Sequence, residues 1–251
     1  MAWLESGAGW PVVLLHAFPL DAGMWRPQLA AAPDGWRFIA PHLRGFGRGP
    51  AAAGPLSMDD YADDVGALLD ALHIETAAIG GLSMGGYVTF ALFRRAPARF
   101  TALILADTRA QADTPEGREA RLQMRALLAE RGPAAIAAQM LPKFFSAQAP
   151  RDVIHGVRTT IEAGVSSGID AAIGALMDRP DSTPDLARIR VPALVIAGDA
   201  DVITPVADAE ALHRGIARST LTVIPGAGHL SNLEQPAAFS RAVADFLLGH
   251  F

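Results

Sequence analysis

One serine of this chain lies in a setting that can make its hydroxyl reactive. Ser83 is the central residue of Gly81-Leu82-Ser83-Met84-Gly85 and directly follows an apolar run. Where a G-x-S-x-G pattern joins a strand to a helix, the serine sits in a sharp, strained turn with its hydroxyl exposed. Glycines flank it because larger side chains would collide with the neighbouring strand and helix. We therefore expect Ser83 to attack a carbonyl carbon.

A serine hydroxyl becomes a useful nucleophile only when a base takes its proton. His229 is the best candidate, because it ends the glycine-rich segment Pro225-Gly226-Ala227-Gly228-His229 after the last predicted strand. In open α/β folds, functional sites gather at the carboxyl ends of the parallel strands. No other histidine follows a late strand on such a loop. We predict that His229 is the base.

The base needs a carboxylate that fixes its tautomer and stabilises its charged form. Three aspartates follow predicted strands, namely Asp107, Asp199 and Asp201. We predict Asp201 as the acid, because it follows the penultimate strand and completes the chain order Ser, Asp, His. We expect Asp199 to bind the backbone of its own loop instead. Asp107 is the alternative acid.

Acyl transfer also needs backbone N–H groups that point at the negative charge developing on the carbonyl oxygen. The N–H of Met84 should supply one, because it follows the serine at the start of a predicted helix. We expect Phe18 to supply the second, from the loop His16-Ala17-Phe18-Pro19, since Pro19 has no N–H. The alternative interpretation of this loop is an ordinary turn at the end of a strand.

Short apolar segments alternate with longer amphipathic segments along most of the chain. The predicted strands are residues 12–15, 38–40, 77–79, 103–105, 193–196 and 221–224. Continuous apolar strands separated by helices predict an α/β fold with a mostly parallel, doubly wound sheet that is covered on both faces. Capping signals predict helix starts at Ser57, Thr204 and Pro236.

This alternation lapses between residues 107 and 184. The segment is rich in Ala, Arg and Met, and its helical pattern is broken at Gly132-Pro133, Ala149-Pro150 and Ser166-Ser167-Gly168. We predict a small helical cap of about four short helices inserted between two strands. The core domain would then comprise residues 1–109 and 185–251, and the cap insertion residues 110–184.

The composition argues against several classes of protein. The chain has no cysteine, which excludes disulfides, thiolate metal sites and a cysteine nucleophile. Its formal net charge of −5 argues against a nucleic-acid partner. No metal-ligand spacing and no phosphate-loop lysine is present, so we expect no metal and no cofactor. The N-terminus resembles no secretory signal and no apolar run has membrane-spanning length, which predicts a cytoplasmic protein that does not enter membranes. The oligomeric state stays open.

Together these motifs resemble the serine hydrolase branch of the α/β-hydrolase fold superfamily. The matching segments are His16–Pro19 for the H-G-x-P loop, Arg44–Gly47 for the R-G-x-G turn, Gly81–Gly85 for the nucleophile elbow, Gly198–Asp201 for the acid loop and Gly226–His229 for the base loop. Two positions depart from the family pattern. Ala17 replaces a glycine, and His42 stands where the family often has aspartate. His42 is either a structural replacement or a titratable group near the pocket rim.

The resemblance implies an enzyme that cleaves a small or medium carboxylic ester or lactone through an acyl-enzyme. Carboxylesterases and 3-oxoadipate enol-lactonase-like hydrolases are the most similar branches. Cofactor-free perhydrolysis or carbon–carbon bond hydrolysis on the same triad is an alternative. A non-catalytic ligand-binding protein of the same fold is a third possibility.

Specificity would come from an apolar substrate pocket between cap and core. The candidate lining residues are Trp25, Met140, Phe144 and Phe145, and packing inside the protein core is the alternative role for each. The cap arginines Arg121, Arg125 and Arg158 would either bind a substrate carboxylate or lie on the solvated helix surface.

Overall fold

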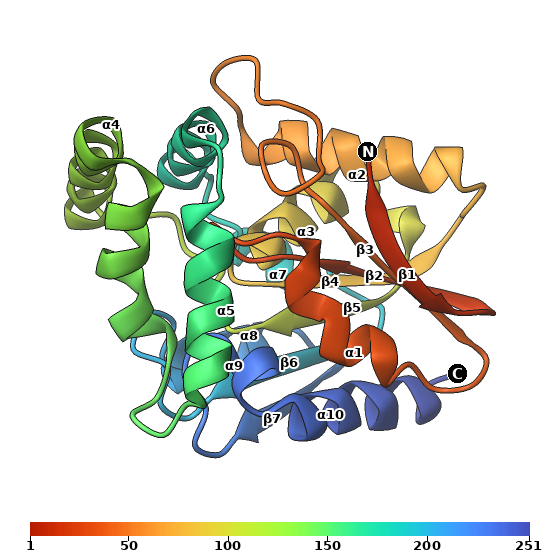
Figure 1. Ribbon diagram of the computed structural model, residues 1–251. Coiled ribbons are helices and arrows are strands. Elements are labelled where there is room, and N and C mark those ends of the chain that lie inside the picture. The colour runs from red at the N-terminus through yellow and green to blue at the C-terminus, as the bar shows by residue number, and fades with distance from the viewer.

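In the computed structural model, which describes residues 1–251, seven strands form one sheet in the order β1-β3-β2-β4-β5-β6-β7 (Figure 1). The strands are β1 (Trp3–Gly7), β2 (Trp10–Leu15), β3 (Trp36–Pro41), β4 (Ala77–Leu82), β5 (Phe100–Ala106), β6 (Ala193–Gly198) and β7 (Ser219–Ile224). Every neighbouring pair is parallel except β1 and β3. The strand order reverses between β2 and β4, and open α/β sheets bind ligands at the carboxyl edge of such a reversal.

The predicted α/β class and mostly parallel sheet are confirmed, and each of the predicted strands is present. The prediction missed β1, whose residues alternate between exposed and half-buried positions. Such a short strand at the edge of a sheet has no continuous apolar run to mark it.

Helices pack on both faces of the sheet. They are η1 (Ala22–Trp25), α1 (Arg26–Ala30), α2 (Met58–Ala71), α3 (Met84–Arg95), η2 (Pro97–Arg99), α8 (Val206–Gly215), α9 (Ser231–Glu234) and α10 (Pro236–Leu248). In Figure 1, α2 and α3 lie on one side of the sheet, and α1 and α10 lie on the other. This arrangement buries the apolar strands between two helical layers.

Two of the predicted helix starts are confirmed. The Ser57 hydroxyl accepts from Asp60 N and the Asp60 carboxylate accepts from Ser57 N, which forms a capping box at α2. Pro236 opens α10 as predicted. The predicted cap at Thr204 is wrong, because α8 begins at Val206 with Pro205 in the cap position. The Thr204 hydroxyl donates instead to Asp201.

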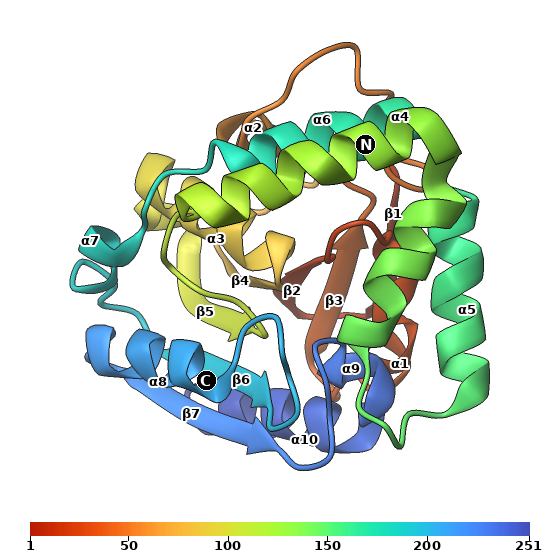
Figure 2. The same cartoon turned by 90° about the vertical axis from the view of Figure 1, so that its left-hand side faces the viewer.

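Four helices lie between β5 and β6, where an insertion of about four short helices was predicted, but the first of them spans 30 residues and is not short. They are α4 (Pro115–Phe144), α5 (Arg151–Glu162), α6 (Ser166–Met177) and α7 (Thr183–Leu186). Inside α4 the backbone kinks at Gly132, where φ is 70°, before Pro133, which cannot donate a helical hydrogen bond. Residues 166–168 form the first turn of α6 rather than a break. Figure 2 shows α4, α5 and α6 grouped around one edge of the sheet. Residues 110–184 are called the cap segment below.

The cap segment meets the core at a direct backbone contact. A Cβ atom on Gly168 of α6 would lie 2.0 Å from the carbonyl oxygen of Gly45, and a Cβ on Gly45 would lie 2.7 Å from Gly168 Cα. Gly45 also has a φ of 85°, which favours glycine. The turn after β3 and the start of α6 therefore pack without any side chain between them.

This contact predicts that Gly168→Ala destabilises the protein by about 1–3 kcal/mol, because the added methyl group must displace backbone. Gly174→Ala in the same helix is the matched control, since a Cβ there meets no atom within 4 Å. We expect the control to raise stability by up to about 1 kcal/mol through helix propensity. Urea unfolding of both variants measures the difference, and equal stabilities would show that the two backbones do not touch.

Candidate active site

Ser83 occupies the turn between β4 and α3. Its φ of 55° and ψ of −112° lie in a region that non-glycine residues rarely adopt. The turn is held by neighbouring strand ends, because Ser83 N donates to Ala106 O over 3.0 Å and the Thr108 hydroxyl donates to Ser83 O over 2.9 Å. A Cβ on Gly85 would lie 2.1 Å from Leu15 O, so that position requires glycine. The strained strand-to-helix turn predicted from the sequence is present.

The predicted acid and base are paired in the interior. His229 Nδ1 lies 2.8 Å from Asp201 Oδ2, and 5% of Asp201 and 1% of His229 are exposed. The other carboxylate oxygen of Asp201 accepts from Ile203 N and Thr204 N, at 2.7 Å and 3.0 Å. Because the carboxylate engages Nδ1, Nε2 is the ring nitrogen left for proton transfer.

The surroundings of Asp201 favour its ionised form. Burial alone would raise its pKa, but the charge of His229 and the hydrogen bonds from His229 and Thr204 outweigh burial and lower the pKa of Asp201. The Thr204 hydroxyl donates to Asp201 Oδ2 over 2.6 Å. The sequence pattern predicts a helix cap at Thr204 and does not predict this hydrogen bond to Asp201.

The segment that carries His229 crosses the carboxyl edge of the sheet. Ser231 Oγ donates to Asp107 after β5, and Asn232 Nδ2 donates to Met24 O over 3.0 Å, in the helix that follows β2. Since β4 lies between β2 and β5, this segment passes the end of the strand that carries Ser83. The structure contains no hydrogen bond between the Ser83 hydroxyl and His229.

The two competing aspartates bind elsewhere. Asp107 Oδ1 accepts from Gly198 N over 2.8 Å, and its other oxygen accepts from Ser231. Burial and the charge of Asp201 raise the pKa of Asp107 well above its usual range. Asp199 Oδ1 accepts from Gly226 N over 2.8 Å and so joins the loops after β6 and β7. Neither carboxylate forms a hydrogen bond or an ion pair with the His229 ring.

The predicted oxyanion donors, Met84 and Phe18, follow the neighbouring strands β4 and β2. Met84 is the first residue of α3, so its N–H has no partner within the helix. Phe18 lies in the loop after β2, where the preceding Ala17 N donates to Met24 Sδ over 3.2 Å while Phe18 N donates to no group of the protein. Both side chains are buried. The two N–H groups therefore come from segments that follow the carboxyl ends of two neighbouring parallel strands.

The predicted pocket residues divide into two groups. Phe144 stacks on the His229 ring with an interplanar angle of 11°, and Phe145 is half-buried beside it. Met140 lines a cavity of about 280 Å³ between α4 and the acid loop, beside Val202 and Ile203. Trp25, by contrast, is fully buried and packs against Phe239 of α10, which is the core-packing alternative named for it.

A second set of contacts joins the end of α4 to the base loop. The buried carboxylate of Glu234 accepts from Gly228 N over 2.9 Å and from both the backbone and the hydroxyl of Ser146. Leu230 N donates to Phe144 O over 3.2 Å. The cap segment therefore ends in direct contact with the loop that positions His229. No local sequence pattern indicates this role of Glu234 or Ser146.

The cap arginines are engaged by acids of the cap segment. Arg121 pairs with Asp113 at 3.2 Å, and Arg125 forms two hydrogen bonds to Asp170. Arg158 lies 3.6 Å from Glu162 on α5. No group of three potential metal ligands occurs anywhere in the chain, and no helix combines the length and hydropathy needed to cross a membrane.

His16, in the loop after β2, is buried and hydrogen-bonded as a neutral ring. Its Nε2 accepts from Leu43 N over 3.0 Å, which assigns the proton to Nδ1, 3.0 Å from Ala17 O. Burial lowers the pKa of His16 to about 4. The imidazole therefore ties the loop that carries Phe18 to the turn after β3.

The fold, together with the positions of Ser83, Asp201 and His229 in loops that follow the strands, indicates the class of protein. Residues 11–144 match the family model described as alpha/beta hydrolase fold, and residues 176–249 match the model described as TAP-like protein. The chain belongs to the α/β-hydrolase fold family, as predicted.

The chain is also similar to proteins that are named as enol-lactonases or as an esterase. The chain is 34% identical over 235 residues to 3-oxoadipate enol-lactonase 2 of Acinetobacter baylyi, covering 92% of this chain and 86% of that one. It superimposes with a TM-score of 0.96 and 39% identity on a thermophilic esterase from Thermogutta terrifontis with malate bound, covering 99% and 93%. An enol-lactonase from Burkholderia xenovorans gives a TM-score of 0.91 at 30% identity, covering 98% and 96%.

The neutral His16 predicts a pH-dependent stability. The unfolded chain binds a proton at histidine below about pH 6.5, whereas folded His16 does so only near pH 4, so the stability present above pH 6.5 is lost as the pH falls. We expect the free energy of unfolding to fall by about 2 kcal/mol between pH 8 and pH 5 from this group. The pKa of buried His42 is also lowered, which adds in the same direction.

Denaturant unfolding of the wild type and of His16→Asn at both pH values measures this effect. The variant should be less stable at pH 8 but should lose less stability on acidification. A variant with the wild-type slope would contradict the assignment to His16.

Proposed function

We propose that this chain is a carboxylic ester hydrolase that cleaves a small or medium ester or lactone through an acyl-enzyme on Ser83. One observation carries the proposal: His229, buried and paired with Asp201, lies on the segment that passes the end of β4, where Ser83 sits in a strained turn. The names of the relatives, which are lactonases and an esterase, support the same class of substrate.

In the proposed reaction, Ser83 Oγ attacks the ester carbonyl while His229 Nε2 accepts its proton. Asp201 holds Nδ1 of the ring and stabilises the imidazolium that forms. The N–H groups of Phe18 and Met84 donate to the oxyanion of the tetrahedral intermediate. His229 then returns the proton to the leaving alcohol, which leaves Ser83 acylated.

The second half of the reaction repeats these steps with water. His229 takes a proton from the water as it attacks the acyl carbonyl, and Ser83 recovers its proton when the carboxylic acid departs. The ring of Phe144 lies nearly parallel to that of His229, with the two centroids 5.8 Å apart, and would shield one side of the base from water. Perhydrolysis and carbon–carbon bond cleavage would use the same groups and stay predictions from the sequence.

Two neighbouring aspartates offer a matched test of the acid. Asp201→Asn should lower kcat for p-nitrophenyl butyrate by about 10³- to 10⁴-fold, because the amide favours the wrong tautomer of His229. Asp199→Asn, two residues earlier, removes a carboxylate charge but keeps an oxygen that can accept from Gly226 N, so kcat should stay within about threefold of the wild type.

Circular dichroism and thermal unfolding should find both variants folded. An Asp201→Asn enzyme with wild-type kcat would contradict the role of Asp201. In that case Asp107→Asn would be the next variant, because Asp107 is the alternative acid.

A further inference from the structure

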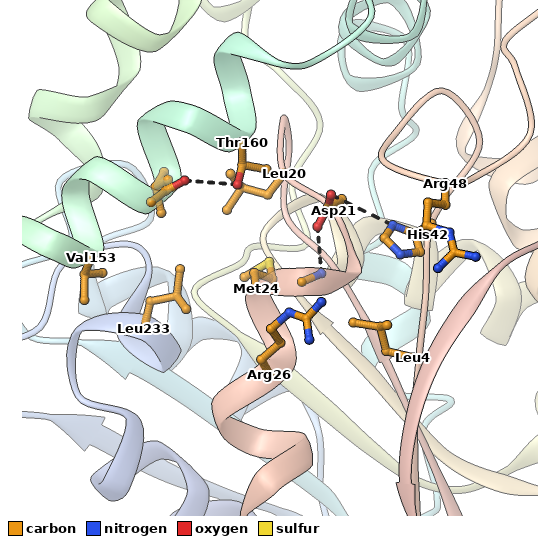
Figure 3. Close-up of a pocket in the computed structure, with 13 residues that line it drawn as sticks. Leu4, Leu20, Asp21, Met24, Arg26, His42, Arg48, Val153, Thr160 and Leu233 are labelled. Carbon is orange, nitrogen blue, oxygen red and sulfur yellow. Dashed lines mark hydrogen bonds and ion pairs between the residues drawn. The ribbon is translucent and has the colours of Figure 1, made fainter.

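A cavity of about 520 Å³ lies outside the proposed active site. Leu20, Asp21 and Met24 from the segment after β2 form one side of it, and the cap helix α5 forms another (Figure 3). None of Ser83, Asp201 and His229 lines this cavity. Its volume is within the range of small-molecule binding sites.

The charged groups of the wall carry an excess of positive charge. Arg26 and Arg48 line the cavity, and neither forms an ion pair with any carboxylate of the chain. Asp21 is the only acid in the wall, and its charged contact is with His42 at 4.0 Å rather than with an arginine. Asp21 Oδ1 accepts from Gly23 N over 2.7 Å. Two guanidinium groups are therefore available to an anion.

His42 adds a buried polar atom without a partner. The residue is 5% exposed, and its Nδ1 forms no hydrogen bond within the protein. Burial lowers the pKa of His42; the charge of Asp21 opposes this effect, and the charges of Arg48 and Arg26 add to it. A neutral imidazole can donate one hydrogen bond from Nδ1, and unsatisfied buried polar atoms are rare in proteins.

The remaining wall is apolar. Its side chains are Leu4, Leu20, Met24, Val153, Val157 and Leu233, with Thr160 beside them. Figure 3 shows His42 and Arg48 on one side of the cavity, and Val153 and Leu233 on the opposite side. No charged residue of α5 faces the cavity. A ligand that fits this wall has an anionic group at one end and an apolar body at the other.

We propose that this cavity binds an organic monoanion with an apolar body, of the class of medium-chain aliphatic carboxylates. Arg26 and Arg48 hold the carboxylate, since guanidinium groups match its geometry, and the buried imidazole of His42 lies behind them, with its Nδ1 4.0 Å from Asp21 Oδ2. The apolar chain lies along α5. Because Met24 Sδ accepts from Ala17 N, the occupant contacts the same segment that fixes the loop carrying Phe18.

Isothermal titration calorimetry with octanoate tests the proposal directly. Octanol has the same chain without the charge, and inorganic phosphate has the charge without the chain. Octanoate should bind at least about tenfold more tightly than either, because the site recognises both parts. If octanol bound as tightly as octanoate, the cavity would not recognise the carboxylate, and the proposal would be wrong. If phosphate bound as tightly as octanoate, the apolar wall would not contribute to binding, and the proposal would also be wrong.

Variants locate the bound octanoate. Arg26→Gln and Arg48→Gln should each weaken binding about tenfold. Gly156→Leu should abolish it, because Gly156 lines the cavity and a Cβ there meets no atom within 4 Å, so the larger side chain fills the space without strain. Arg241→Gln is the control, since Arg241 lines a separate cavity of about 520 Å³ beside β7 and α10.

Thermal unfolding should find each variant at least as stable as the wild type, and Gly156→Leu somewhat more stable because leucine has the higher helix propensity. The proposal is overturned if octanoate does not bind the wild type, or if Gly156→Leu and the arginine variants bind it as the wild type does. In the latter case octanoate occupies another site, such as that of the reaction product. These outcomes do not depend on Ser83, so they are separate from the test of the proposed function.

Discussion

The strand β7 lies at one edge of the sheet. The loop that follows it has to bring the imidazole of His229 to the carboxyl ends of β2 and β4, where the strand order reverses. Buried hydrogen bonds hold it there: Ser231 to Asp107 and Asn232 to Met24 beyond the histidine, and His229 to Asp201 at the histidine itself. Such bonds hold their geometry in a low-dielectric interior, where a lost partner leaves an expensive unsatisfied group. The arrangement of the proposed site depends on this crossing.

The cap segment is part of the same arrangement. Its long helix α4 ends where Phe144 covers the His229 ring, and Glu234 holds both the following Ser146 and the base loop. At its other contact with the core, α6 meets the turn after β3 through the backbones of Gly168 and Gly45. A displacement of the cap segment would therefore disturb the loop that positions His229.

Much of this organisation follows from local sequence. Apolar runs, the glycines around Ser83 and the capping box at Ser57 identify strands, the strained turn and a helix start, because each depends on neighbouring residues alone. Contacts between distant segments left no such pattern. From the sequence alone, Glu234 cannot be distinguished from an ordinary surface acid, because only the fold brings Ser146 to its carboxylate. Thr204 has the pattern of a helix cap, but in the structure its hydroxyl donates to Asp201. For Trp25, the contact with Phe239 of α10 decides between the two roles that the sequence left open. The strand β1 was missed for a local reason, because it has no continuous apolar run.

The central claim is that Ser83 is the nucleophile, and covalent labelling tests it most directly. A fluorophosphonate probe should modify one residue of the native protein, with the label found on the peptide that contains Ser83. Ester hydrolysis should fall in proportion to labelling, and Ser83→Ala should be folded, unlabelled and inactive toward p-nitrophenyl butyrate. A Ser83→Ala variant that retains full hydrolysis, or a label on a different residue, would contradict the account.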